Sequence, residues 1–113
     1  MNKVSFNDAI EFDENRVKTK VIVETSFSKE IRILLKNGQM MKEHKTAHPI
    51  IIHVIEGCID LGINGENLFM KVGDIIHLES NVPHDLKANE DSVVRLTLSK
   101  LDSVERVNEL LDK

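Results

Sequence analysis

The chain has 113 residues, of which 41% are hydrophobic and 30% are charged, and its formal net charge is −4. This length predicts a single domain, residues 1–113, with a hydrophobic core of its own. No cluster of Lys and Arg stands out, so we expect no nucleic-acid partner. The longest apolar run, residues 49–55, contains a histidine and is far too short to cross a bilayer, so we expect no membrane partner.

Cysteine and aromatic content narrow the class of protein further. The only cysteine, Cys58, excludes an internal disulfide, and no hydrophobic leader follows the N-terminal Met-Asn-Lys. We therefore expect a cytoplasmic location. Because the chain has four Phe and neither Tyr nor Trp, its core must be aliphatic. The β-branched residues Ile and Val favour sheet.

The N-terminal 16 residues are polar, and Val4 with Phe6, then Ile10 with Phe12, predict two short strands at most. After them, alternating and continuous apolar runs predict further strands. Two Asn-Gly dipeptides, at 37–38 and 64–65, predict tight hairpin turns. The predicted strands are residues 17–24, 30–36, 39–44, 50–56, 58–63, 66–72, 75–78, 84–88 and 92–99.

The last residues follow a different period. Apolar side chains at 101, 104, 107, 110 and 111 have helical spacing, which predicts a short amphipathic helix over 101–111 packed on the body or on a partner. The fold class predicted is all-β: a small antiparallel β-barrel of jelly-roll type over 17–99, followed by this helix. A rolled antiparallel sheet is preferred because it removes most exposed strand edges.

Five histidines, the commonest metal ligands and general acid–base groups, lie at 44, 48, 53, 77 and 84. His44 and His48 are four residues apart, but Pro49 disfavours a helix before it. On an extended chain the two histidines would be about 13 Å apart. Joint ligation of one metal therefore needs a bend at residues 46–47.

Two histidines and three glycines together resemble the motifs of the cupin family. Gly38, five residues, His44 and then Gly57 thirteen residues later resemble its first motif, G-x5-H-x-H-x3-4-E-x6-G. Gly73-Asp74, with His84 eleven residues after the glycine, resembles the second motif, G-x5-P-x-G-x2-H-x3-N. The 15 residues between the motifs match small single-domain cupins. The resemblance implies a β-barrel of six to eight strands and a homodimer.

The sequence also departs from both motifs. Thr46 stands where the family has its second histidine, and Ile50 stands where it has a glutamate. In the second motif the proline, glycine and asparagine are replaced by Glu79, Asn81 and Ala88. His44 and His84 remain as family ligands.

The resemblance implies a divalent transition metal, such as Zn, Fe, Ni or Mn, and a small organic ligand in the barrel pocket. We expect His44, His48 and His84 as metal ligands, with His77 and Glu43 as weaker candidates. The residues expected to line the ligand pocket are Thr46, Ile50, Met40 and His77.

Whether the chain is an enzyme is left open by the sequence. A metal with an open position would suit oxygenase, isomerase or lyase chemistry. The alternative is a non-catalytic small-molecule binding or sensor protein that has lost the metal, because Thr46 and Ile50 replace two family ligands.

Further expectations concern the dimer and three single residues. The run 50–55 is apolar on both faces, which is consistent with a homodimer that buries this second face, or the helix over 101–111. His53 is expected on an outer layer or in a dimer contact, Arg95 in solvent, and Cys58 as an unreactive thiol.

Overall fold

The computed structural model describes residues 1–100, so the helix predicted for 101–111 lies outside the described residues. The predicted strands from residue 17 onward are confirmed, with bounds that agree within two residues. They are β1 (Lys18–Glu24), β2 (Ser28–Leu35), β3 (Met40–His44), β4 (Ile50–Glu56), β5 (Cys58–Ile63), β6 (Glu66–Lys71), β7 (Ile75–Leu78), β8 (His84–Ala88) and β9 (Ser92–Ser99).

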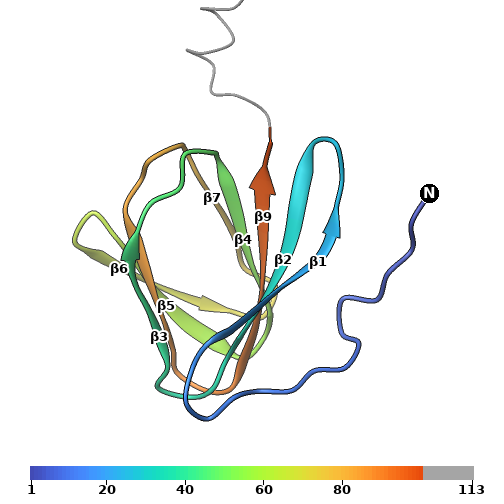
Figure 1. The fold of residues 1–113 in the computed structure, drawn as a ribbon. Coiled ribbons are helices and arrows are strands. Elements are labelled where there is room, and N and C mark those ends of the chain that lie inside the picture. Colours follow the sequence, from blue (N-terminus) through green and yellow to red (C-terminus); the bar gives the residue numbers. More distant parts are fainter. Residues whose placement is uncertain (101–113) are drawn as a thin grey trace, which may run out of the picture.

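The strands form two antiparallel sheets that face each other (Figure 1). One sheet has the order β1-β2-β9-β4-β7, and the other has the order β3-β8-β5-β6. The fold is therefore all-β as predicted, but the prediction that the sheets close into a barrel was wrong. Within residues 1–100 no strand pairing joins an edge of one sheet to an edge of the other.

The chain crosses repeatedly between the sheets, and this explains why they stay separate. Only two connections, β1–β2 and β5–β6, join neighbours within a sheet. The hairpin predicted at Asn64-Gly65 is confirmed: both residues have positive φ, 52° and 78°, and β5 pairs with β6. The hairpin predicted at Asn37-Gly38 was wrong, because the chain changes sheets there and the Gly38 N–H donates to the Ala88 carbonyl at the end of β8.

The core lies between the inner faces of the two sheets. It is aliphatic, as the composition predicted, because every core side chain is Ile, Leu, Val, Ala or Met. Strand β4 lies in the interior of its sheet and contributes alternate residues to this core. The buried core residues are Ile33, Leu35, Ile50, Ile52, Val54, Ile59, Leu61, Met70, Leu78, Leu86, Ala88 and Val94.

The N-terminal segment covers the outer face of the five-stranded sheet beside β1 and β2 (Figure 1). The short strands predicted for it were wrong: residues 1–12 contain none, and only an isolated bridge joins Asp13 to Arg16. Arg32 explains the arrangement, since its side chain is 4% exposed and its Nη1 donates to the carbonyls of Phe6 and Asp8. A buried guanidinium needs such acceptors, and the segment's main chain supplies them.

The rest of that outer face is more open. Arg95 has 44% of its side chain exposed, as predicted, and pairs with Glu30 at 2.9 Å. His53 lies on the same face, in register with Arg95. The described residues contain no helix of the length and apolar character needed to cross a bilayer.

Candidate functional site

His44 and His84 lie opposite each other on neighbouring strands of the four-stranded sheet, where β3 ends and β8 begins. They are register partners in the β3–β8 pair. Their ring centroids are 4.4 Å apart, and the rings are tilted by 57°. His84 is 3% exposed, whereas His44 is exposed. The pair therefore joins a buried imidazole to one that solvent or a ligand can reach.

An irregularity in β3 puts His44 in this position. Met41 pairs with Leu86 and packs on the core, and the register shifts before His44 pairs with His84. Three residue steps on β3 thus match two on β8, which is the mark of a β-bulge. With strict alternation from Met41, Glu43 would face His84. The bulge therefore places the imidazole of His44, and not the carboxylate of Glu43, opposite His84.

Both histidine rings are held in the same way. The Nδ1 of His44 lies 2.8 Å from the Lys42 carbonyl oxygen, and the Nδ1 of His84 lies 2.9 Å from the Val82 carbonyl oxygen. A carbonyl can only accept, so we infer that each Nδ1 carries the proton. In the neutral ring this leaves the lone pair on Nε2. A main-chain carbonyl on one ring nitrogen is the usual support of a histidine that ligates through the other.

The turn after His44 links the two loops beside the pair. The chain bends at residues 47–48, next to the position where joint ligation by His48 requires a bend. The Oγ1 of Thr46 donates to the His48 carbonyl at 2.7 Å, and the Asn81 N–H donates to the Thr46 carbonyl at 2.7 Å. The loop that leads to His84 is thus tied to the turn that leads away from His44.

The other predicted pocket residues lie elsewhere. Ile50 is 2% exposed and part of the core. Met40 is 54% exposed and pairs with Lys87, on the face opposite the core-packed Met41. His77 lies on the outer face of the other sheet, with its Nε2 3.8 Å from the Glu79 carboxylate. The structure does not bring Met40 or His77 to the histidine pair.

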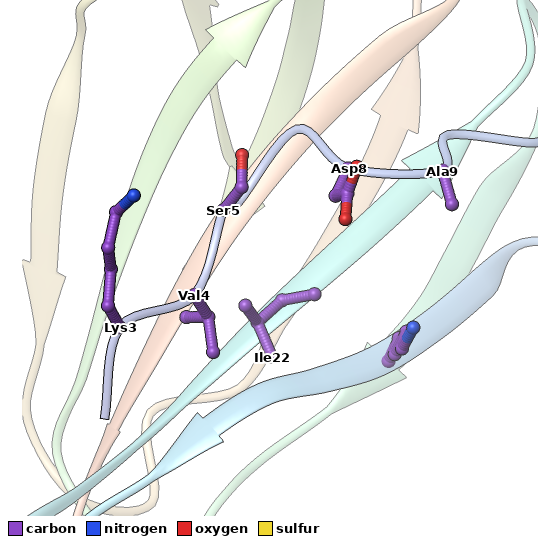
Figure 2. A pocket seen from close by; sticks show the side chains of 7 residues that line it. Lys3, Val4, Ser5, Asp8, Ala9 and Ile22 are labelled. Atoms are coloured by element: carbon purple, nitrogen blue, oxygen red, sulfur yellow. The ribbon is translucent and has the colours of Figure 1, made fainter. Parts of the chain in front are cut away.

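The outer face of the five-stranded sheet is hollowed in more than one place. The first, about 350 Å³, separates the N-terminal segment from β1, and Figure 2 shows Val4 and Ile22 approaching each other across it. The second, about 220 Å³, lies over β4, β7 and β9 and includes His77 in its wall. Neither wall contains His44 or His84.

Away from the histidine pair, Glu30 and Cys58 have shifted pKa values without forming a reactive cluster. Partial burial would raise the pKa of Glu30, but hydrogen bonds from Thr97, Ser28 and Arg95 outweigh it and lower that pKa. For Cys58, desolvation and the nearby carboxylates of Glu90 and Asp60 raise the pKa. Its thiol is therefore held protonated, in keeping with the unreactive thiol expected from the sequence.

Sequence reasoning missed three features that build the site. These are the β-bulge before His44 and the carbonyls of Lys42 and Val82 that hold the rings. No residue type marks a carbonyl acceptor, so neither anchor could be read from the sequence. The only sequence feature near either carbonyl anchor is the dipeptide Val82-Pro83, which directly precedes His84.

The comparisons with known proteins identify the family and the fold. The Cupin domain family model matches residues 31–100, which include both histidines and all strands from β3 to β9. This is more than half of the chain. The protein belongs to the cupin family. No curated protein matches the sequence.

Solved structures show the same cupin fold. An RmlC-like cupin from Desulfovibrio desulfuricans has a TM-score of 0.80 at 22% identity, over 88% of this chain and 96% of that one. A protein from Thermus thermophilus has a TM-score of 0.79 at 13% identity, over 88% and 98% of the two chains. KdgF from Halomonas has a TM-score of 0.70 at 19% identity, over 80% and 87%. At these identities the likeness concerns the fold.

The donor set of this cupin fits part of a metal centre. Two neighbouring imidazoles with free Nε2 lone pairs suit Zn, Ni, Fe or Mn. Among residues 1–100, however, no group of three or more His, Cys, Asp or Glu side chains is placed to hold a metal. The two protein ligands that fit are therefore His44 and His84. His48, predicted as the third, is not joined to them in such a group.

Proposed function

We propose that this cupin binds a small organic ligand at the His44–His84 pair, together with a divalent transition metal to which both Nε2 atoms would be ligands. The observation that carries the proposal is the shared support of the two rings, each with its Nδ1 bonded to the carbonyl two residues earlier. Each ring thereby keeps a free Nε2 lone pair, and the two ring centroids lie 4.4 Å apart.

The surroundings favour a ligand with a polar end and an apolar body. His84 pairs with Ile63 on its other side, and the next position along β8 on the same face is the core residue Leu86. Oxygen donors of a small acid or sugar-like molecule would meet the imidazoles, and its carbon atoms would meet this aliphatic surface. The buried Oγ of Ser80, in the loop before His84, lacks a hydrogen-bond partner among the described residues. Such a group is usually satisfied by water or a ligand.

A metal held by two imidazoles would depend on the ligand for its remaining donors. When bound, it would supply Lewis-acid polarisation of a coordinated oxygen, which suits isomerase and lyase reactions. The protein's own part is to fix both ring orientations and, through the buried His84, to exclude water from one side of the site. His48 stays a proposed third ligand, since the chain bends at residues 47–48, next to the bend at 46–47 that its approach requires.

A second candidate function is a small-molecule binding or sensor protein that works without metal. Ile50 favours it, because the position of the family glutamate holds a core side chain that is 2% exposed. Neutral imidazoles with free Nε2 atoms can accept hydrogen bonds from hydroxyl groups of a ligand.

The two functions are separated by calorimetric titration of metal-free protein with Zn²⁺ and Ni²⁺. The wild type, His44→Ala and His84→Ala are compared, with His53→Ala on the outer face as the control. Metal binding by the pair predicts an affinity loss of at least about 10-fold in both site variants, a size seen even for outer-shell groups, and none in the control. Equal affinity in all four proteins would move the function to metal-free ligand binding.

A further inference from the structure

Arg32 carries a buried positive charge that no carboxylate of residues 1–100 neutralises. The residue is 4% exposed, and none of the ion pairs in the described part of the chain includes it. Its side-chain hydrogen bonds run from Nη1 to the carbonyls of Phe6 and Asp8, which are neutral acceptors. A buried cation is normally paired with an anion, because its lost hydration is otherwise poorly compensated.

One edge of the Arg32 guanidinium has no acceptor within residues 1–100. Nη1 is engaged by the N-terminal segment, whereas the buried Nε lacks a hydrogen-bond partner among the described residues. Nε and Nη2 form an edge that can bind both oxygen atoms of a carboxylate. A buried donor without a protein partner is usually satisfied by water or a ligand. This edge therefore favours an oxyanion.

Strand pairing places two more cations beside Arg32. Its register partner on β1 is Lys20, and its register partner on β9 is Arg95. Residues paired in this way have their side chains on one face with Cβ atoms about 5 Å apart, and like charges so placed are destabilising. Glu30 neutralises Arg95, but no ion pair within residues 1–100 includes Lys20. An anion near Lys20 and Arg32 would relieve their repulsion.

The hollow between the N-terminal segment and β1 gives an anion access to these two cations. Its volume is about 350 Å³, within the usual range for small-molecule sites. Its wall includes Lys20 and also Asp8, whose carbonyl accepts from Arg32, so Arg32 lies next to this wall. Val4 and Ile22 face each other across the hollow (Figure 2). They offer apolar contact to the rest of a ligand.

The N-terminal segment has room to shift when such a ligand enters. A second hollow, of about 200 Å³, borders Val4, Phe6 and Ile22 on the side of Glu30 and Arg95. The segment is therefore not closely packed on the sheet at Val4, and a small movement would open the Nε edge of the buried guanidinium.

We propose that the N-terminal segment and β1 form a second ligand site, which binds a small organic carboxylate with an apolar body. The carboxylate would lie between Lys20 and the Nε–Nη2 edge of Arg32, and the carbon atoms would lie between Val4 and Ile22. The site is on a different face of the molecule from the histidine pair, and it does not depend on the proposed function.

NMR titration of the ¹⁵N-labelled full chain tests the site through the Nε–H resonance of Arg32, which is assigned by its loss in Arg32→Lys. The probes are hexanoate and benzoate, with 1-hexanol as the uncharged counterpart and inorganic phosphate as an anion without an apolar body. The proposal predicts that at least one carboxylate moves this resonance downfield in a saturable way, and that hexanol does not. Phosphate binding as tightly as the carboxylates would overturn the apolar part of the proposal.

Variants with exposed substitutions check the charges without disturbing the buried Arg32. Lys20→Gln should weaken carboxylate binding by about twofold or more, and Asp8→Asn should strengthen it by about twofold, because Asp8 is the one acidic residue in the wall. Lys87→Gln, on the outer face of the other sheet, is the matched control and should leave affinity unchanged. No saturable shift with either carboxylate at millimolar concentration, or equal affinity in Lys20→Gln and wild type, would overturn the site.

Discussion

His44 and His84 face each other across the β3–β8 pair, and each ring is held through Nδ1 by the carbonyl oxygen two residues before it. The repeated arrangement on two strands gives the pair a defined tautomer and orientation before any ligand binds. Such preorganisation lowers the cost of binding, because the rings need not be ordered by the ligand.

Residue 46 occupies the position of the second histidine in the cupin motif. Substituting it therefore tests whether His44 and His84 are arranged like the metal ligands of that motif. We expect Thr46→His to raise Zn²⁺ affinity by about 10-fold or more, because a third imidazole completes the usual minimum set of protein ligands. The measurement is calorimetric titration, with Lys45→His as the control one position away. Unchanged affinity in Thr46→His would show that residue 46 does not reach the metal.

Gly57 lies in the tight turn between β4 and β5, where the chain passes from one sheet to the other. It has φ of +82°, and a Cβ there would collide with the Ser92 Oγ and lie 2.5 Å from the Asp91 carbonyl oxygen. We expect Gly57→Ala to lower the free energy of unfolding by about 3 kcal/mol, from left-handed strain and overpacking together. Gly65→Ala, with φ of +78° and no atom within 4 Å, should cost only about 1 kcal/mol. The free energies of unfolding are measured by urea denaturation. Equal losses for Gly57→Ala and Gly65→Ala would contradict the predicted steric clash at Gly57.

Glu30 makes stability depend on pH. Its carboxylate accepts from Ser28, Arg95 and Thr97, and these bonds lower its pKa below the ordinary 4.5. The stabilisation is therefore fully present above pH 4.5 and is lost as the pH falls through the folded-state pKa. We expect Glu30→Gln to lower the free energy of unfolding by about 1–2 kcal/mol at neutral pH.

The same comparison at low pH checks the cause. Once the pH falls below the folded-state pKa, the wild-type carboxyl is protonated, so the difference between wild type and Glu30→Gln should shrink. Glu24→Gln removes an exposed carboxylate from the same sheet and should have a smaller effect at neutral pH. A difference that stays constant with pH would assign the effect of Glu30→Gln to packing instead of charge.

The strand positions could be predicted because local pattern determines them. Alternation in 92–99 and the continuous run in 50–56 predicted the observed bounds of β9 and β4. Pairing between strands was harder to predict, since it depends on contacts distant in sequence. Asn37-Gly38 has the composition of a hairpin turn, yet its N–H groups bond to the β8–β9 region, at Asp91 and Ala88.

The candidate histidine pair could be singled out from the sequence, but its geometry could not. Motif spacing singled out His44 and His84, which the structure brings into contact. Their facing depends on the bulge after Met41, where strict alternation would have chosen Glu43. The structure places Met40 and His77 on outer faces, because each directly precedes a residue that packs on the core and successive side chains of a strand point to opposite faces.

The central claim is tested most directly by following the ring nitrogens of ¹⁵N-labelled histidines during Zn²⁺ titration. The account predicts that both Nδ1 atoms of His44 and His84 are protonated in the free protein, and that both Nε2 resonances shift together as Zn²⁺ is added. His53 should not take part. Nε2-protonated rings in the free protein, or Zn²⁺ binding that leaves both Nε2 resonances unmoved, would contradict it.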